Sequence, residues 1–547
     1  APSAAELRAH LAARVPEYMV PSAFVAMDAL PLTRNGKVDR RARPEPDAVA
    51  SAEYVAPRTP TEEALAGIWA PLLGAARVSA EDGFFALGGH SLLATRVVTR
   101  VRDAFGVDLP LRAIFESPTL SALAAEIDRL AGTGAGVGTP SIVPVERTND
   151  LPLSFAQEHM WRMARAQPDS TAFTIGTVFR FSGELDADAL ERALAELVRR
   201  HEALRTVFPA VDGQPVQRIL SPGFHLPRHD LAALPDDARA FEAERILREP
   251  FATPFDLARG PLFRAVLVRL GDDEHRFALS MHHLVSDGWS LGVLLGELSA
   301  LYTAFSRGEP SPLPETAIQY ADYATWQRGR VRGQVLDAHV AYWRAMLEGA
   351  PPLLRLPTDR PRPAVPSLRG AEEHLLLPSD EHAAVRALAR AEGATLYMTL
   401  LAALATVLSR LSGQREVVVG TPIATRPPGT EPLVGLFVTG VALRVAVDEE
   451  ESFRALLRRV RQTTLEAYAH QDVPFARVVD AMQTERIPGA APVFQAVLNV
   501  LSYEEGSFAL PGVEVEAYGH AGDQTSKFDL TLYAQETPAG LHLRLVY

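Results

Sequence analysis

Apolar residues between positions 61 and 130 recur every three or four residues, the spacing of helices with one buried face. Two such faces are formed by Leu65, Ile68 and Leu72, and by Leu93, Val97, Val101 and Phe105. Gly88-Gly89 allows a tight turn between them, and Ser91 stands where the second of these helices begins. The pattern predicts four helices in this stretch, with a start near Thr61, and therefore a small helical bundle.

Two stretches without apolar periodicity divide the chain. Residues 43–60 are rich in Pro and small residues, and Gly recurs at alternate positions after Ala131. Alternating Gly is typical of a flexible tether. We therefore divide the chain into segments 1–45, 58–130 and 149–547, with a flexible linker at 131–148.

Strand and helix patterns alternate through residues 149–547, which predicts a layered α/β fold. Asp186 can cap a helix that runs to Arg199, because an aspartate side chain accepts hydrogen bonds from free backbone N–H groups. The whole chain is therefore predicted to be multidomain, with a small bundle followed by a large α/β unit.

A strand–turn–helix junction within this unit carries two histidines. Residues 276–283 alternate like a strand, so that His283 and His282 point to opposite faces. Asp287-Gly288 predicts a turn, and Ser290 is expected to cap the helix that follows. His283 thus ends a strand where a chain changes direction, a usual position for a reacting side chain.

Composition and charge exclude several classes of protein. The net charge is -13 with no basic block, which disfavours a nucleic-acid partner. Cysteine is absent, so disulfides and thiolate nucleophiles are excluded. The longest apolar stretch, residues 396–408, is too short for a membrane span and predicts a buried helix. We expect a cytoplasmic protein without a membrane partner, and we note that lysine occurs only as Lys37 and Lys527.

The residues alone leave the chemistry open. Ser91 can be an ordinary helix cap, or an exposed hydroxyl that a modifying enzyme reaches. His282 and His283 can be hydrogen-bonded core residues or can supply a general base with Asp287 nearby. A metal site is disfavoured, because adjacent histidines on a strand point apart and no third ligand is near in sequence.

The stretch Leu87-Gly88-Gly89-His90-Ser91-Leu92 resembles the attachment motif of peptidyl carrier proteins in non-ribosomal peptide synthetases. The resemblance covers residues 58–130. It implies that Ser91 carries a covalent 4′-phosphopantetheine, which a phosphopantetheinyl transferase attaches. The usual Asp-Asn-Phe-Phe opening of the motif reads Asp-Gly-Phe-Phe here.

The stretch His282-His283-Leu284-Val285-Ser286-Asp287-Gly288 resembles the HHxxxDG motif of condensation domains. Further motifs of that family follow in the family's order at residues 154–157, 200–206, 320–326, 420–422, 470–475 and 492–495. The resemblance covers 149–547 and implies two chloramphenicol-acetyltransferase-like lobes in a V, with a tunnel between them.

The same resemblance implies roles for the site residues. His283 accepts a proton from the attacking amine or orients it, whereas the ring of His282 points away. Asp287 is expected to be structural and ion-paired with an arginine, for which Arg200 is the first choice and Arg205 the second. Gly288 is expected to let the thioester approach the backbone closely.

Residues 16–21 and 35–40 resemble the C-terminal end of an adenylation domain, in which Lys37 matches a lysine that contacts the acyl-adenylate. We interpret segment 1–45 as a remnant of such a domain. The implied partners are an upstream adenylation domain and a downstream acceptor carrier.

Because the carrier precedes the condensation domain, the thioester on Ser91 is expected to be the donor. The implied reaction is amide bond formation, with the subtype that joins two L-residues favoured. The chain ends inside a predicted strand, so we expect a C-terminally truncated condensation domain. The alternatives are an epimerisation domain, which shares the histidine motif, and a catalytically inert docking platform.

Overall fold

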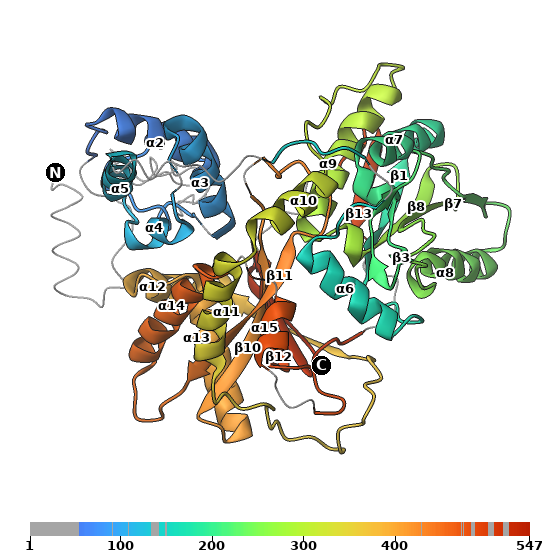
Figure 1. Cartoon of the computed structure of the whole chain (residues 1–547). Helices are drawn as coiled ribbons and strands as arrows, with labels where there is room; N and C mark the ends of the chain where they lie inside the picture. Colours follow the sequence, from blue (N-terminus) through green and yellow to red (C-terminus); the bar gives the residue numbers. More distant parts are fainter. Residues whose placement is uncertain are drawn as a thin grey trace, which may run out of the picture.

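The computed structural model describes residues 54–547 with gaps at 90, 108, 133–141, 148–149, 428, 472, 474, 483–486, 502–507 and 518–524. The predicted adenylation remnant at 1–45, with Lys37, lies outside the described residues. The described chain forms a small helical domain and two lobes of a large domain (Figure 1). The small domain and the C-terminal lobe each have one hydrophobic core, and the N-terminal lobe has one on each face of its sheet.

The small domain is a bundle in which each helix buries one face. Its described helices are α2 (Pro60–Leu73), α3 (Ser91–Phe105), α4 (Leu111–Glu116) and α5 (Leu120–Gly132). Leu65, Trp69, Phe84 and Ile114 are fully buried at its centre. α2 starts just before Thr61 because the Thr59 side chain accepts a hydrogen bond from the Glu62 amide. The predicted four-helix bundle is confirmed.

The N-terminal lobe contains a five-stranded sheet in the order β13-β1-β8-β7-β6. The strands are β13 (Val513–Ala517), β1 (Thr174–Gly183), β8 (Glu274–His282), β7 (Phe263–Arg269) and β6 (Arg228–Asp230). The helices of the lobe are α6 (Phe155–Ala166), α7 (Ala187–Arg200), α8 (Asp236–Ala252), α9 (Gly288–Phe305) and α10 (Tyr320–Arg330). Short strands β2 (Thr206–Val207), β3 (Ala210–Val211), β4 (Gln214–Pro215) and β5 (Arg218–Ile219) form two small ribbons.

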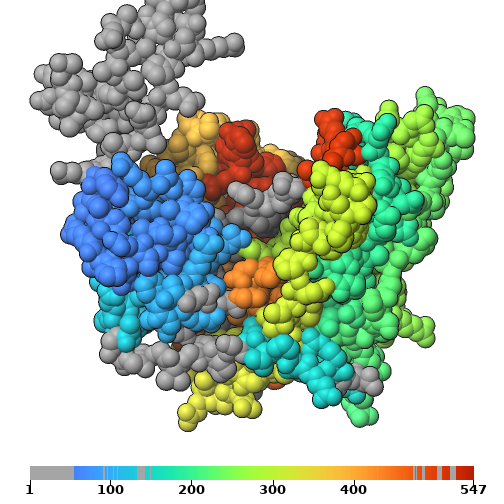
Figure 2. Space-filling view, turned by 90° about the horizontal axis from the view of Figure 1, so that it is seen from above, coloured from blue at the N-terminus to red at the C-terminus, as the bar shows by residue number. Residues whose placement is uncertain are grey.

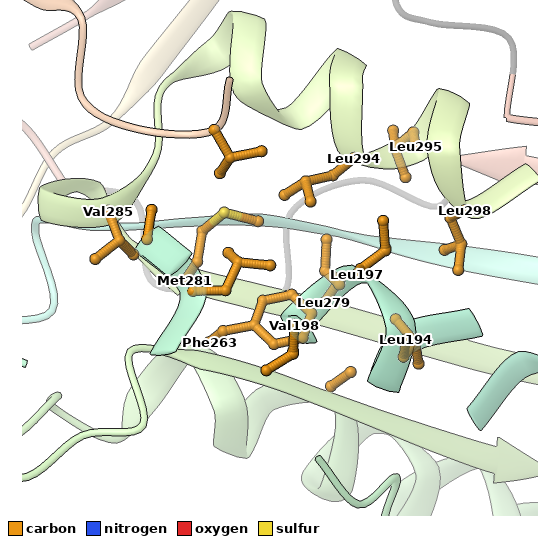
Figure 3. Close-up of a cluster of buried hydrophobic side chains, with 14 of the residues drawn as sticks. Leu194, Leu197, Val198, Phe263, Leu279, Met281, Val285, Leu294, Leu295 and Leu298 are labelled. Atoms are coloured by element: carbon orange, nitrogen blue, oxygen red, sulfur yellow. The ribbon is translucent and has the colours of Figure 1, made fainter. Parts of the chain in front are cut away.

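The two faces of this sheet are covered by different helices. Leucines of α7 and α9 pack over Leu279 and Met281 of β8 (Figure 3). On the other face, α8 packs with Ile246 and Leu247 against the strands. Asp186 caps α7 as predicted, through hydrogen bonds to the amides of the first turn. A packed strand β8 is therefore the support from which the histidine turn emerges.

The C-terminal lobe contains a six-stranded sheet in the order β11-β10-β12-β14-β15-β9. The strands are β11 (Val438–Ala446), β10 (Glu416–Ala424), β12 (Ala496–Leu501), β14 (Leu530–Thr537), β15 (Gly540–Val546) and β9 (Glu372–Pro378). Its helices are α11 (Gln334–Leu347), α12 (Ser379–Ala391), α13 (Leu396–Ser412), α14 (Phe453–Tyr468) and α15 (Phe475–Met482). α13 is the buried helix predicted from the apolar stretch, and Leu401, Ala402 and Ala405 are fully buried on it.

The two lobes exchange segments. β13 follows β12 in the chain yet pairs with β1 in the other lobe's sheet. Between β10 and β11 the chain enters the N-terminal core, where Leu433, Leu436 and Phe437 are buried. Gly435 is required in this segment, since an added Cβ would lie 1.9 Å from the Tyr320 ring. The lobes are therefore interlocked rather than merely adjacent.

The small domain packs against the C-terminal lobe (Figure 2). Phe115 of α4 is buried in that lobe's core, 4.8 Å from the Phe85 ring and 6.3 Å from the Tyr468 ring. The Arg461 guanidinium on α14 donates to the Phe115 carbonyl at 3.2 Å. A second contact reaches α9, where the Arg96 guanidinium lies 4.8 Å above the Trp289 ring.

The connection between the domains is shorter than the linker predicted at 131–148. α5 continues to Gly132, and residues 142–147 lie against α10. The Val145 amide donates to the Asp322 carboxylate at 2.8 Å, and Arg147 pairs with the same carboxylate at 2.6 Å. A buried acceptor therefore anchors the part of the chain that enters the large domain.

Among the described residues, a single helix long and apolar enough to cross a membrane is not found. The bent pair Ser379–Ala391 and Leu396–Ser412, with 102° between its helices, passes that test by length and composition.

Candidate active site

One cavity of about 1560 Å³ connects both lobes and the small domain. His283, Gly288 and Trp289 line it from the N-terminal lobe. Thr421, Thr425, Lys527 and other residues line it from the C-terminal lobe, and Gly88 and Gly89 line it from the small domain. A molecule attached near the start of α3 could therefore reach His283 without leaving this space.

The turn after β8 fixes the ring of His283. β8 ends at His282, one residue earlier than predicted, and residues 283–285 form a single 3₁₀ turn. The His283 amide donates to the Phe173 carbonyl at 2.8 Å. Nδ1 of His283 lies 2.8 Å from the Ser286 carbonyl oxygen, which can only accept. Nδ1 therefore carries the hydrogen, and Nε2 of the neutral ring keeps its lone pair.

The surroundings keep His283 in this neutral form. Burial lowers the pKa of His283, and the Lys527 ammonium lowers it further, while the Asp287 carboxylate raises it in part. A neutral imidazole near physiological pH can accept a proton or a hydrogen bond from a substrate. The geometry and electrostatics of His283 are those of a base.

His282 lies inside the core of the N-terminal lobe. Its Nδ1 accepts a hydrogen bond from the Leu284 amide at 3.0 Å, and its ring packs 6.1 Å from the Phe173 ring and 6.0 Å from that of Phe255. Burial, and to a smaller extent the neighbouring His283 and Lys527, lowers the pKa of His282 to about 3. This ring is neutral and shapes the turn, as expected from its position opposite His283.

Asp287 caps α9 and pairs across the lobes with Arg426. Oδ1 of this fully buried aspartate accepts from the Ser290 amide at 2.8 Å, the Ser290 hydroxyl at 2.7 Å and the Arg426 guanidinium at 3.0 Å. Oδ2 accepts from the Phe437 amide at 3.0 Å. α9 therefore starts at Gly288, and the predicted cap at Ser290 is wrong, because Ser290 lies inside the first turn that Asp287 caps.

Both arginines predicted as partners of Asp287 are wrong. Arg200, at the end of α7, is buried against Glu297 at 3.1 Å and also donates to the Pro314 carbonyl. Arg205 donates to the Leu220 carbonyl and lies 3.9 Å from Glu202. Both have partners on their own lobe, whereas the cation beside Asp287 comes from the C-terminal lobe.

Sequence reasoning missed Arg426 and gave no role to Lys527 or Trp289. Arg426 follows β10 and the Gly420-Thr421-Pro422 motif, but nothing in its spacing points to Asp287. Lys527 was visible as one of two lysines in the sequence, which was the available signal. Trp289 directly follows the histidine motif, and its Nε1 donates to the Glu431 carbonyl at 2.9 Å, so it also bridges the lobes.

The small domain presents the start of α3 to the cavity. Ser91 is the first residue of α3, and the first turn has no acidic residue. Gly88 has a φ of 97°, and a Cβ on Gly89 would lie 2.5 Å from the Phe84 ring. Glycine is therefore needed at both positions to bring the backbone before Ser91 along the cavity wall.

No group of three or more His, Asp or Glu side chains that could hold a metal ion occurs among the described residues. The cavity is lined by His283 and Lys527, and it extends to the glycines before α3.

Three family models match the chain. The model described as "Condensation domain" matches residues 147–547, "Phosphopantetheine attachment site" matches 63–127, and "AMP-binding enzyme C-terminal domain" matches 1–37. The last match covers the segment predicted as an adenylation remnant.

The chain is also similar in sequence and in structure to known proteins of peptide synthesis. Over its full length the chain is 47% identical to a linear gramicidin synthase protein from Brevibacillus parabrevis, and it spans 7% of that protein. The X-domain in a complex with OxyB from teicoplanin biosynthesis is similar at 28% identity and a TM-score of 0.68, covering 75% of this chain and 91% of that one. The first condensation domain of the calcium-dependent antibiotic synthetase shares the fold, at 24% identity, a TM-score of 0.58, and 73% and 91% of the two chains.

The residues around α3 fit a phosphopantetheine. Gly88 leaves the approach to the helix start free of side-chain bulk, and the cavity continues from there to His283. The free N–H groups of an α-helix N-terminus favour a phosphodiester. When bound, the group supplies a thioester to the cavity.

A double-mutant cycle should identify the partner of Asp287. Asp287→Asn and Arg426→Met should each lower the free energy of unfolding by about 3–5 kcal/mol, because each leaves a buried charge without its partner. The double variant should lose less than the sum, by about 0.5–3 kcal/mol. Urea denaturation measures this. The control cycle with Arg205→Met should be additive; coupling to Arg205 and additivity with Arg426 would contradict the assignment.

The pH dependence of stability should report the core position of His282. Because its pKa of about 3 in the folded chain lies below the ordinary value, the unfolded chain takes up the proton first. The free energy of unfolding should therefore fall as the pH drops from 6.5 towards 3, by up to about 1.4 kcal/mol per pH unit from this residue. His282→Gln should show a flatter dependence in urea titrations between pH 7 and 4.5. If wild type and His282→Gln show the same pH dependence of the free energy of unfolding, His282 is not buried in the folded chain.

Proposed function

The chain belongs to the condensation-domain family of non-ribosomal peptide synthetases, and we propose that it joins an acyl group held on Ser91 to the amine of a second carrier-bound residue. Condensation domains form amide bonds in peptide synthesis. The observation that supports this role most directly is the continuous cavity, which runs from the glycines before Ser91 to His283.

His283 is proposed to receive the attacking amine. Its Nδ1 hydrogen is held by the Ser286 carbonyl, so Nε2 is available as the acceptor. An amine that donates a hydrogen bond to Nε2 keeps its lone pair directed away from the ring, towards the thioester carbonyl carbon. The base can then take the proton that the nitrogen loses as the amide forms.

Asp287 is proposed to act by position. The Ser286 carbonyl, which orients the ring of His283, belongs to the peptide unit whose nitrogen is that of Asp287. The contacts of Asp287 to Ser290, Arg426 and Phe437 therefore fix this carbonyl as well as the start of α9. Gly288, the next residue, lines the cavity and is proposed to leave room for the thioester.

The partners follow from the order of the domains. The carrier packs on this chain's own C-terminal lobe, which supports the Ser91 thioester as the donor. We propose a downstream carrier as the acceptor, a phosphopantetheinyl transferase as the modifying enzyme and two L-residues as the joined pair. The cytoplasmic location expected from the sequence stays a prediction.

A docking platform is a second candidate, favoured by the likeness to an X-domain whose solved complex contains OxyB. An epimerisation domain is a third, because it shares the histidine motif. A platform would leave the donor unchanged, and an epimerase would invert its α-carbon without moving it.

One transfer experiment separates the three. The full chain is loaded at Ser91 with an aminoacyl-pantetheine and mixed with an aminoacyl acceptor carrier, and intact masses are recorded. We expect peptide on the acceptor. His283→Ala should slow the transfer about 100-fold or more, since it removes the base.

The matched controls are His282→Gln, which should keep most of the transfer, and Ser91→Ala, which should not load. An unmoved donor with inverted stereochemistry would support the epimerase instead, and an unmoved, unchanged donor would support the platform.

The contact between Arg96 and Trp289 should hold the small domain where the donor thioester can reach His283. Arg96→Ala should slow single-turnover transfer in the full chain about 2–10-fold, because a partly exposed cation–π contact contributes about 0.5–1 kcal/mol or somewhat more. Arg100→Ala is the control, because Arg100 is exposed one helical turn beyond Arg96, and it should leave the rate unchanged. If wild type and Arg96→Ala transfer at equal rates while circular dichroism shows an intact fold, the contact between Arg96 and Trp289 does not assist transfer.

A further inference from the structure

Lys527 lies in the cavity on the lobe opposite to His283. It stands between Thr525, which bridges to Arg369, and the start of β14. Its Nζ lies 5.2 Å from the centroid of the Phe173 ring. The carbonyl of Phe173 accepts the backbone hydrogen bond of His283. The C-terminal lobe thus brings a cation against the residue that holds the proposed base.

The charge of Lys527 is not neutralised by a salt bridge within the described part of the chain. The Lys527 side chain is exposed to the cavity, which it lines together with His283. Partial loss of hydration inside the cavity lowers the pKa of Lys527 to about 8, so that the amine is mostly an ammonium at neutral pH. A cation in this position makes it harder to protonate a neighbouring group such as His283.

Three titratable groups surround His283 on neighbouring elements. His282 lies beside it on β8 and is neutral, and Asp287 at the start of α9 is paired with Arg426. Lys527 completes the set from the other lobe. Of the two charges that act on His283, the ammonium opposes protonation more strongly than the carboxylate favours it.

We propose that Lys527 is a positioning residue for amide formation, whose ammonium group faces the cavity beside Phe173 and acts together with burial to keep Nε2 of His283 open to the acceptor amine. The inference rests on the proposed function and adds a side chain that tunes the proposed base. In the reaction, the amine nitrogen forms a bond to the thioester carbonyl carbon and the carbon–sulfur bond breaks. The proton that leaves nitrogen passes to Nε2 and from there to the departing sulfur. An imidazole that was already protonated could not accept it.

Two measurements on the full chain test this role. The first is the rate of peptide transfer from loaded Ser91 between pH 5.5 and 8. The second is the titration of His283 by NMR on histidine-labelled protein, with its signal assigned by comparison with His283→Gln. The variants are Lys527→Met and Lys527→Arg. Arg386→Met serves as the control, because Arg386 lines the same cavity but pairs with Glu536.

Loss of the positive charge should make His283 easier to protonate. In Lys527→Met, the NMR titration and the acidic limb of the rate profile should both move up by about half a pH unit or more. Lys527→Arg keeps the charge and should restore both, and Arg386→Met should change neither.

An unchanged His283 titration in folded Lys527→Met would overturn the inference, even if transfer is active. If wild type forms no peptide, the proposed function fails, while the NMR titration still decides the role of Lys527. If Lys527→Met does not fold, Lys527→Gln is used, and the same shift is required of it.

Discussion

The site depends on a buried ion pair that belongs to both lobes. A buried carboxylate costs free energy unless its oxygens are fully hydrogen-bonded. Asp287 meets this condition with one residue of its own lobe, Ser290, and with Arg426 and Phe437 of the other. The histidine turn can therefore reach its low-energy arrangement when the segment between β10 and β11 is inserted, and not before.

The proposed catalytic parts come from three places. The N-terminal lobe provides the imidazole, the C-terminal lobe provides Arg426 and Lys527, and the small domain provides the start of α3. Neither lobe encloses the cavity alone. A shift of one lobe against the other would move Arg426 and Lys527 relative to His283. The interlocked segments therefore hold the proposed site together as well as the fold.

Local sequence patterns predicted the features that depend on contacts within a few residues along the chain. The bundle, the helix after Asp186 and the face of His283 all follow from spacing and capping within a few residues. The cap of α9 was placed wrongly because Asp287 and Ser290 are both good caps, and their choice depends on which amide lies within reach. The histidine motif and the carrier motif were recognisable because they are short and contiguous.

The arginine partner was missed for a different physical reason. Arg200 and Arg205 lie in another motif of the same lobe, but each satisfies its charge with partners close to it. Arg426 reaches Asp287 because the chain crosses between lobes after β10, which no periodicity encodes. Long-range pairing of this kind follows from the topology and could not be read from spacing.

The anchored linker adds a limit on how far the carrier can travel. Residues 142–147 are held on α10 through Asp322, and α5 ends at Gly132. Ten peptide steps join Gly132 to Ile142, and a fully extended chain of that length spans about 35 Å at most. The small domain must therefore stay close to the edge of the large domain where Asp322 lies. A carrier restricted in this way can serve one side of the cavity, which fits the proposal that a second carrier brings the amine from the other side.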